Sequence, residues 1–327
     1  MSSGLYDPLP HHRLSLVGII EATAAIDPAF LDSPQYEATE LSEVLGCRLV
    51  LKEETHNPIG SFKGRGADYF VRRVVERSDD HLLVCASTGN FGQGMAYAGR
   101  SRGRDVVVFA DRNANPLKLD RIADLGADIR QTGDDFDAAK AAAKTFCRET
   151  GSWMIEDGKE PEISEGAGTI AVELLREHEV DVILVPLGNG ALVNGIGRWA
   201  RAASADTRVI GVAAKGADAM AVSFKKGRMI ARHHARTIAE GISVRVPVPE
   251  ALADMVQLVD DVLVVDDQRM IEAMKLIRDT TGQVVEPSAA VGVAALMVDP
   301  AEHSGQTVAT VLTGNNLTTA QAERWLS

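Results

Sequence analysis

The stretch NPIGSFKGRGA, residues 57–67, carries Lys63 between a turn and the start of a helix. Pro58 and Gly60 precede the lysine, and apolar residues recur at helical spacing along residues 66–77. N–H groups at a helix start favour bound anions such as a phosphate. Burial disfavours the charged form of a lysine, which leaves its amine free to form an imine. The pattern indicates a reactive lysine beside an anion site, although a surface lysine after a turn fits the stretch equally well when it is taken alone.

Downstream of this stretch, short apolar runs alternate with helical patterns. Runs such as VVVF (106–109) and VILVPL (182–187) are apolar on both faces, as expected of parallel strands covered by helices on each side. The alternation predicts an α/β fold with a mainly parallel sheet. The expected helices cover 66–77, 135–150 and 267–282, and the expected strands cover 82–87, 105–110, 127–132, 152–157, 181–188, 208–214, 261–267 and 307–314.

The composition argues against several classes of partner. The formal net charge of −12 over 327 residues argues against nucleic acid and against anionic lipid, because both require clustered Lys and Arg. No run of 18 apolar residues occurs, so no membrane span is expected. The N-terminus lacks a secretory signal pattern, and the expected location is the cytoplasm. Cys47, Cys85 and Cys147 are too scattered for a disulfide framework or a zinc motif, and we expect buried free thiols.

A second motif, CASTGNFGQG at residues 85–94, follows an expected strand and precedes an expected helix. Ser87, Thr88, Gly89 and Asn90 are therefore expected at the strand-to-helix turn. Hydroxyl and backbone N–H groups at such a turn suit a carboxylate, and an Asn amide can bond a ring hydroxyl. Ordinary N-capping by Ser or Thr is the alternative for this motif by itself.

A third motif, VPLGNGALVNGIG at residues 185–197, follows the same plan. A strand is expected to end at Leu187, and the small residues from Gly188 to Ala191 precede a helix. Small residues let backbone N–H groups approach a phosphate closely. The spacing is not the dinucleotide-binding pattern, and a tight turn without a ligand remains the alternative.

The fourth motif, VLTGNN at residues 311–316, ends the last expected strand. Thr313 would bring a neutral hydroxyl to the carboxyl end of that strand, where open α/β sheets bind ligands. By contrast, the irregular segment 216–250 carries the basic runs KKGR (225–228) and RHH (232–234). We expect a solvated loop or helix face there, with a substrate-facing role as the alternative.

Together, the four motifs resemble the fold type II (tryptophan synthase β-like) pyridoxal-phosphate enzymes, in particular the serine/threonine dehydratase group. Serine racemase and threonine synthase are near relatives of that group. The resemblance runs over nearly the whole chain and implies two lobes of open, twisted, mainly parallel sheets with the cofactor between them. A large cofactor-binding domain would take residues 1–77 and 154–327, and a small mobile domain would take residues 78–153.

The resemblance also implies a role for each motif residue. Lys63 would hold pyridoxal 5'-phosphate as a Schiff base and carry the α-proton, and Phe62 would pack near the ring. Asn90 would bond the ring hydroxyl, and Thr313 would face the pyridine nitrogen. The phosphate cradle would consist of Gly188, Asn189, Gly190, Ala191 and Leu192, and the substrate carboxylate would lie among Ser87, Thr88, Gly89 and Gln93.

The sequence departs from the family pattern at several positions. Phe91 stands where the dehydratases usually have His, and Asn189 and Ala191 stand where they usually have glycines. Metal-dependent members usually have Glu after the strand RVIGVAA, where this chain has Lys215. An ammonium there would replace the charge of a cation, so we predict no divalent metal. A solvent-facing Lys215 is the alternative.

The implied activity is that of an ammonia-lyase, which converts a small β-hydroxy or β-substituted amino acid such as threonine or serine to a 2-oxo acid and ammonia. A hydroxyl partner such as Thr313 leaves the cofactor ring a weaker electron sink, which fits rapid elimination better than transamination. The alternatives are a threonine synthase-like replacement enzyme and a racemase in which Ser87 or Thr88 supplies a second base. A binding protein would be expected to lack Lys63, and an NAD-binding Rossmann-type enzyme is the remaining reading.

The expected assembly is a homodimer, by the resemblance and by the general preference for symmetric oligomers. The expected ligand is a small amino acid. The chain ends about a dozen residues after Thr313, so we do not expect the regulatory domain of biosynthetic threonine dehydratases.

Overall fold

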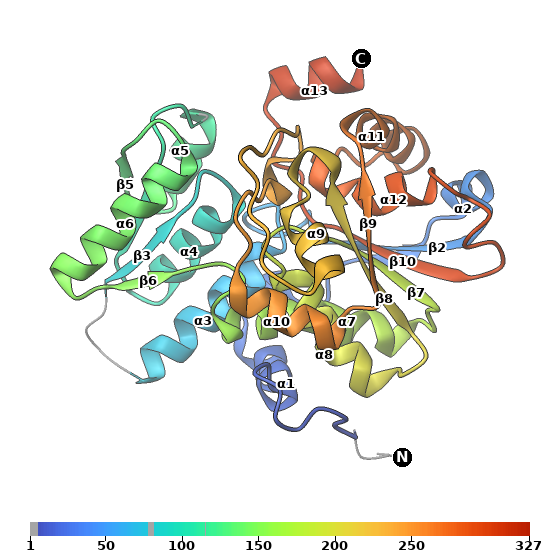
Figure 1. Cartoon of the computed structure of the whole chain (residues 1–327), viewed down its shortest axis with the longest axis horizontal. Coiled ribbons are helices and arrows are strands. Elements are labelled where there is room, and N and C mark those ends of the chain that lie inside the picture. The colour runs from blue at the N-terminus through green and yellow to red at the C-terminus, as the bar shows by residue number, and fades with distance from the viewer. Residues whose placement is uncertain (1–5, 78–81, 115) are drawn as a thin grey trace.

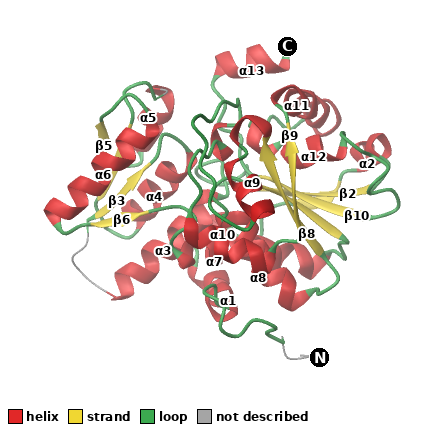
Figure 2. Cartoon of the chain, viewed as in Figure 1, coloured by secondary structure: helices red, strands yellow, loops and turns green. Residues whose placement is uncertain are grey.

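The computed structural model describes residues 6–77, 82–114 and 116–327, and its strands form two separate sheets (Figures 1 and 2). Neighbouring strands are parallel except for one antiparallel pair at the edge of the larger sheet, β1 with β2. The larger sheet has six strands, in the spatial order β1 (Gln35–Glu37), β2 (Arg48–Glu53), β10 (Thr307–Leu312), β7 (Val182–Pro186), β8 (Arg208–Ala214) and β9 (Asp261–Val265).

Helices cover both faces of the six-stranded sheet, so its strands are apolar on both sides. Along β7, Leu184 belongs to one core, while Ile183 and Val185 belong to the other, because successive strand side chains point to opposite faces. The first core contains residues of α2 (Thr39–Leu45), α11 (Asp267–Thr281), α12 (Val291–Leu296) and α13 (Thr319–Leu326). The second contains residues of α7 (Pro161–Glu177), α8 (Ala191–Ala203), α9 (Ala219–Lys226) and α10 (Pro249–Leu258).

The smaller sheet has four parallel strands, in the order β5 (Asp128–Gln131), β4 (Val106–Ala110), β3 (Leu83–Ala86) and β6 (Trp153–Ile155). Side chains of α6 (Phe136–Thr150) pack on one face of this sheet. Those of α3 (Lys63–Arg77), α4 (Asn90–Ser101) and α5 (Pro116–Asp124) pack on the other. The helix α3 therefore connects the two sheets, and the remaining long helix, α1 (Leu16–Ala25), lies against α7.

The predicted α/β class is confirmed, and each predicted strand and helix is present within a few residues. The helix expected at 66–77 begins earlier, at Lys63, and the strands β1 and β2 were not predicted. The domain boundaries stay a proposal: β6 runs two residues past the predicted boundary at 153, and residues 78–81 lie outside the described residues.

The cysteines and the lengths of the helices agree with what the composition predicts. The three cysteines are buried and unpaired, as predicted. Burial raises the pKa of Cys85 to about 12, so this thiol stays protonated near neutral pH although it precedes the Ser87 turn. Within the described residues, no helix combines the length and apolar character that a membrane crossing requires.

A buried cluster of charges fixes the first turn of α3. Arg65 is fully buried and donates to both Glu54, at 2.7 Å, and Glu173, at 2.5 Å. Lys52 on β2 also pairs with Glu173 at 2.5 Å. Because each buried carboxylate and cation has a partner, the cluster ties α3 to β2 and α7, and removing one member would leave uncompensated buried charge.

A second buried acid, Glu165 on α7, stands apart from that cluster. Its Oε1 accepts a hydrogen bond from the backbone N–H of Ser15 at 2.7 Å, just before α1. Burial is the largest cause that raises the pKa of Glu165 from its ordinary value of 4.5 to about 7. A raised carboxyl pKa contributes stability that is complete below the unfolded-state pKa and is lost as the pH rises through the folded-state pKa.

We therefore expect the stability of Glu165→Gln relative to the wild type to rise by about 3 kcal/mol between pH 4 and pH 8. The glutamine keeps an oxygen for the Ser15 N–H but needs no buried charge. Denaturant unfolding at the two pH values measures the difference. Glu43→Gln, exposed on α2, is the control for the loss of one surface carboxylate. An equal difference in unfolding free energy between Glu165→Gln and the wild type at both pH values would contradict a raised pKa for Glu165.

Candidate active site

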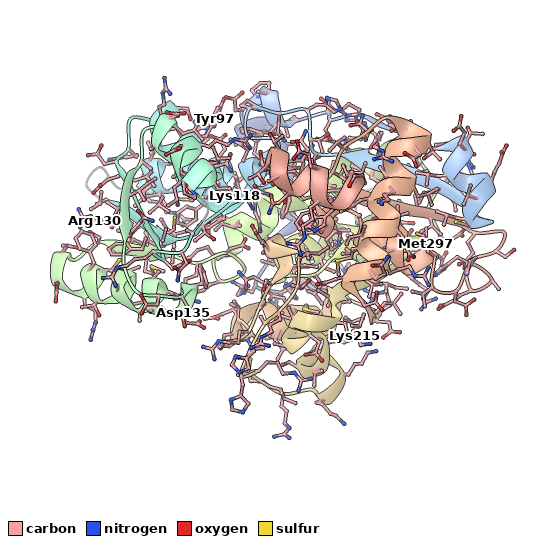
Figure 3. The ribbon with its side chains drawn as sticks, turned by 90° about the horizontal axis from the view of Figure 1, so that it is seen from above. Tyr97, Lys118, Arg130, Asp135, Lys215 and Met297 are labelled. Atoms are coloured by element: carbon pink, nitrogen blue, oxygen red, sulfur yellow. The ribbon has the colours of Figure 1, made fainter. Side chains whose placement is uncertain are left out.

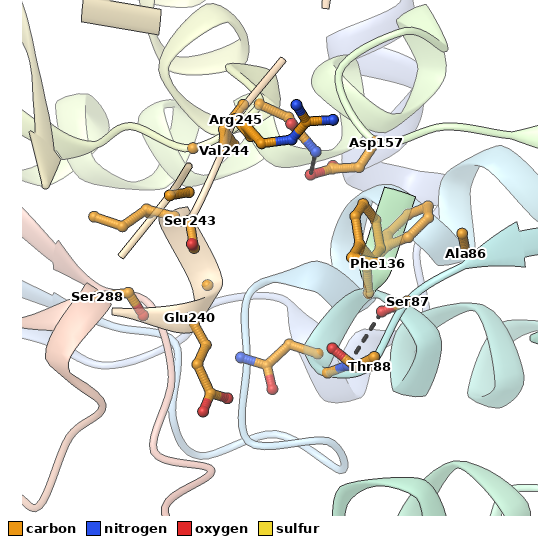
Figure 4. Close-up of a pocket in the computed structure, with 18 of the residues that line it drawn as sticks. Ala86, Ser87, Thr88, Phe136, Asp157, Glu240, Ser243, Val244, Arg245 and Ser288 are labelled. Carbon is orange, nitrogen blue, oxygen red and sulfur yellow. Dashed lines mark hydrogen bonds between the residues drawn. The ribbon is translucent and has the colours of Figure 1, made fainter. Parts of the chain in front are cut away.

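One pocket of about 740 Å³ lies between the two sheets and is lined by residues of both (Figure 4). Figure 4 shows Ser87 and Thr88 on one side of it and Glu240 and Ser288 on the other. Every predicted site residue but one lines this pocket, namely Phe62, Lys63, Ser87, Thr88, Gly89, Asn90, Gly188, Asn189, Gly190, Ala191, Leu192 and Thr313. The exception is Gln93, which is buried on α4 and is not part of the wall.

Lys63 stands at the start of α3, with its side chain 13% exposed. Its Nζ donates to Asp157 Oδ2 at 2.6 Å and lies 4.5 Å from the centroid of the Phe62 ring. The preceding turn is held by Asn57, whose Oδ1 accepts from the N–H of Ser61 at 3.2 Å. The amine is thus aimed into the cleft next to a carboxylate that the sequence analysis did not identify.

The Ser87 turn joins β3 to α4. Ser87 Oγ accepts from the backbone N–H of Gly89 at 3.2 Å and of Gly92 at 2.9 Å. The helix itself begins at Asn90; the N-cap residue Gly89 has no side chain, and Ser87 takes the N–H of Gly92 from the first turn. Free N–H groups at a helix start attract an anion, so this wall of the pocket suits a carboxylate.

The glycine turn Gly188–Leu192 joins β7 to α8 in the same way. Gly190 adopts φ = +100°, a left-handed conformation that glycine accepts without strain, and no side chain caps α8. A Cβ on Gly190 would lie 3.1 Å from the Cβ of Ala251. The turn therefore presents backbone N–H groups to the pocket at a second helix start.

Thr313 follows β10 and is 5% exposed. Its carbonyl oxygen accepts from the N–H of Phe62 at 3.1 Å, which joins the end of β10 to the turn that carries Lys63. Glu286 and Asn316 flank this region and were not predicted as site residues. Asn90 Nδ2 donates to Glu286 Oε1 at 3.0 Å.

The basic segment expected to be solvated is exposed, and part of it also faces the pocket. The pocket wall includes His233, His234 and Arg236. This placement fits the alternative in which the segment faces the substrate. Two ion pairs span the cleft at this level: Arg245 Nε donates to Asp137 at 2.6 Å, and Lys118 pairs with Glu240.

Lys215 is exposed and lies beside α9 (Figure 3). The ion pairs of the described residues include none with Lys215, which supports the solvent-facing alternative. No cluster of three or more potential metal ligands occurs among the described residues. The absence of a divalent metal stays a prediction.

A two-lobed α/β fold with a lysine at a helix start, facing an uncapped glycine turn across one cleft, defines a fold type II pyridoxal-phosphate enzyme. The family model described as "Pyridoxal-phosphate dependent enzyme" matches residues 26–314. The chain belongs to this family and is a pyridoxal-phosphate-dependent enzyme.

Named relatives fall into two activity groups. The serine racemase of Oryza sativa subsp. indica is 31% identical over 310 residues, which cover 91% of this chain and 90% of that protein. The L-threonine ammonia-lyase of Geobacter sulfurreducens is 34% identical over 278 residues, which cover 84% and 69% of the two chains. The solved structure of maize serine racemase matches with a TM-score of 0.89 at 29% identity and covers 95% of this chain and 96% of the other.

The residues of this pocket fit pyridoxal phosphate. A primary amine, Lys63, reaches the cleft, and the N-terminus of α8 offers uncapped backbone donors for a phosphate. Asn90 and Thr313 offer an amide and a hydroxyl for the ring.

We expect Gly190→Ala to weaken the binding of pyridoxal phosphate, because a Cβ at φ = +100° strains the turn and shifts its N–H groups. Gly227→Ala is the matched control: Gly227 has φ = +62° after α9, and its added Cβ meets no atom within 4 Å. Both variants should lose about 1 kcal/mol of stability. Only Gly190→Ala should raise the cofactor Kd, measured by absorbance titration of the cofactor-free protein. Equal Kd values would contradict a role for this turn.

Proposed function

We propose that this enzyme is an ammonia-lyase that converts a small β-hydroxy or β-substituted amino acid, such as threonine or serine, to a 2-oxo acid and ammonia. The observation that carries the proposal is the presence of Lys63 and a neutral hydroxyl residue, Thr313, in one cleft. Relatives named as L-threonine ammonia-lyases, at 30% and 34% identity, support the same reaction class.

The choice of elimination rests on Thr313. Pyridoxal phosphate, when bound, supplies an electron sink for the bonds at the substrate α-carbon. Thr313 offers a hydroxyl rather than a carboxylate, so it would not hold a proton on the ring nitrogen and would leave this sink weak. Negative charge at the α-carbon is then best discharged at once by loss of a β-substituent, which is elimination.

Lys63 is the group proposed to remove the α-proton. Its Nζ lies 2.6 Å from Asp157, so the proton that it takes up would be held in an ammonium next to a carboxylate. The face of the Phe62 ring, 4.5 Å away, would add a cation–π contact to that ammonium. Lys63 and Asp157 would together keep the proton within the cleft.

The two helix starts are proposed to hold the two anionic groups. The N-terminus of α4, with Ser87, Thr88 and Gly89, would bind the substrate carboxylate. The glycine turn before α8 would bind the cofactor phosphate. This division leaves the space between the two helix starts for the α-carbon and the leaving group.

We expect the wild-type enzyme, supplied with cofactor, to release 2-oxo acid and ammonia from at least one member of a panel of β-substituted amino acids. Lys63→Ala should lower that rate on the order of a thousandfold or more, because the proton acceptor is lost. Lys140→Ala is the control, since Lys140 also lines the pocket but pairs with Glu156. Normal turnover by Lys63→Ala would contradict the proposal.

A racemase is the second candidate, and one contact favours it. The two backbone N–H groups that donate to Ser87 Oγ would stabilise negative charge on this oxygen, as a second base requires. The serine racemases among the relatives support this reading.

If the enzyme racemises, Ser87→Ala should abolish formation of the D-enantiomer from the L-amino acid while Lys63 still permits elimination. Chiral chromatography of the reaction mixture measures both products. Thr88→Ala is the neighbouring control. Racemisation that is unchanged in Ser87→Ala would exclude Ser87 as the second base.

Assembly and location belong to the same proposal. We propose a homodimer, in line with the prevalence of symmetric homo-oligomers, and a cytoplasmic location. The division into a large domain, 1–77 and 154–327, and a small mobile domain, 78–153, is supported by the separation of the two sheets.

A further inference from the structure

The amide of Asn90 is held by two side chains from the other side of the cleft. Asn90 Nδ2 donates to both oxygens of Glu286, at 3.0 and 3.2 Å. Asn316 Nδ2 donates to Asn90 Oδ1 at 2.8 Å. Asn90 begins α4 of the smaller sheet, whereas Glu286 precedes α12 and Asn316 follows β10 of the larger sheet. The contact therefore spans the two lobes.

Asn316 is itself fixed on every polar atom of its side chain. Its Oδ1 accepts from Arg121 Nη1 at 2.6 Å, and its Nδ2 also donates to the carbonyl oxygen of Ile59 at 2.8 Å. Its backbone N–H donates to Glu286 Oε1 at 2.8 Å. Asn316 and Glu286 are thus parts of one network, and both are buried.

The charge of Glu286 sets the direction of this network. A carboxylate accepts hydrogen bonds but does not donate them, so the NH2 end of the Asn90 amide must point toward it. Both oxygens belong to one carboxylate, so a single N–H of the Asn90 amide can serve both. The second N–H is then available to another acceptor.

A purely structural role for Glu286 would carry a large free-energy cost, because its carboxylate is buried. The side chain is 6% exposed, and its hydrogen-bond donors are neutral: the Asn90 amide, the Asn316 N–H and the Ser288 hydroxyl. The ion pairs of the described residues include none with Glu286. A buried anion without a counter-charge is costly, and such groups are concentrated at functional sites.

We propose that Glu286 and Asn316 are positioning residues that fix the amide of Asn90, so that its remaining N–H points at the ring hydroxyl oxygen of the bound cofactor. The proposal rests on the proposed function of a pyridoxal-phosphate enzyme and on the family resemblance, which assigns Asn90 to that oxygen. It adds that the hydrogen bond from Asn90 to the ring depends on Glu286 and Asn316 of the opposite lobe.

The test measures the cofactor rather than the reaction. The Kd for pyridoxal phosphate is determined by absorbance titration of the cofactor-free protein, for the wild type and for Glu286→Ala. We expect Glu286→Ala to raise the Kd roughly tenfold, as for the loss of one charge-assisted hydrogen bond. Glu286→Gln should recover most of the affinity, because its Oε1 can accept the same two N–H groups. Glu272→Gln, which alters an exposed carboxylate on α11 outside the pocket lining, should bind as the wild type does.

A double-mutant cycle separates positioning from general damage to the fold. If Glu286 acts through Asn90, Glu286→Ala should cost no further affinity in an Asn90→Ala background. Additive losses, or a wild-type Kd for Glu286→Ala, would overturn the proposal. Should Glu286→Ala unfold, Asn316→Ala in the same two backgrounds gives the same decision. Cofactor affinity does not depend on which product forms, so failure of the ammonia-lyase assay would be distinguishable from failure of this inference.

Discussion

The position of the first turn of α3 is the constraint on which the cleft depends. Lys63 reaches the pocket because Arg65 holds the turn that carries it in place. The guanidinium of Arg65 donates hydrogen bonds to Glu54 and Glu173 in the interior. Gly66, one residue further, lets the carbonyl of Ile163 on α7 approach where a side chain would collide. The motif therefore combines a reactive amine with the residues that anchor it, and the anchor is largely buried charge.

Much of the fold could be predicted because its signals are local. The strands β4 and β7 are continuous apolar runs, and α6 and α11 begin at a capping Asp and end before a glycine. The strand β2 was missed because RLVLKE carries Lys52 and Glu53, which look like surface residues. They are buried here because each finds a partner elsewhere in the fold, Lys52 in Glu173 and Glu53 in Tyr36.

The candidate site divides in the same manner. Lys63, Ser87 and the glycine turn could be identified because each motif carries its own turn and helix start. Asp157 and Glu286 could not, since their contacts join residues 94 and 196 positions apart in the chain. Gln93 is buried on α4 and does not line the described pocket, so its expected place at the substrate carboxylate stays a prediction.

The two ion pairs across the cleft, Arg245 with Asp137 and Lys118 with Glu240, differ from the Arg65 cluster in one respect. Water reaches them, so dissolved ions screen their attraction, and each contributes little at physiological ionic strength. The free energy needed to separate the lobes at the entrance should then fall as salt is added. The buried ion pairs of Arg65 should not change, because dissolved ions do not reach them. Small molecules would thus enter and leave through a cleft entrance that is held by weak ion pairs, while the position of Lys63 stays unchanged.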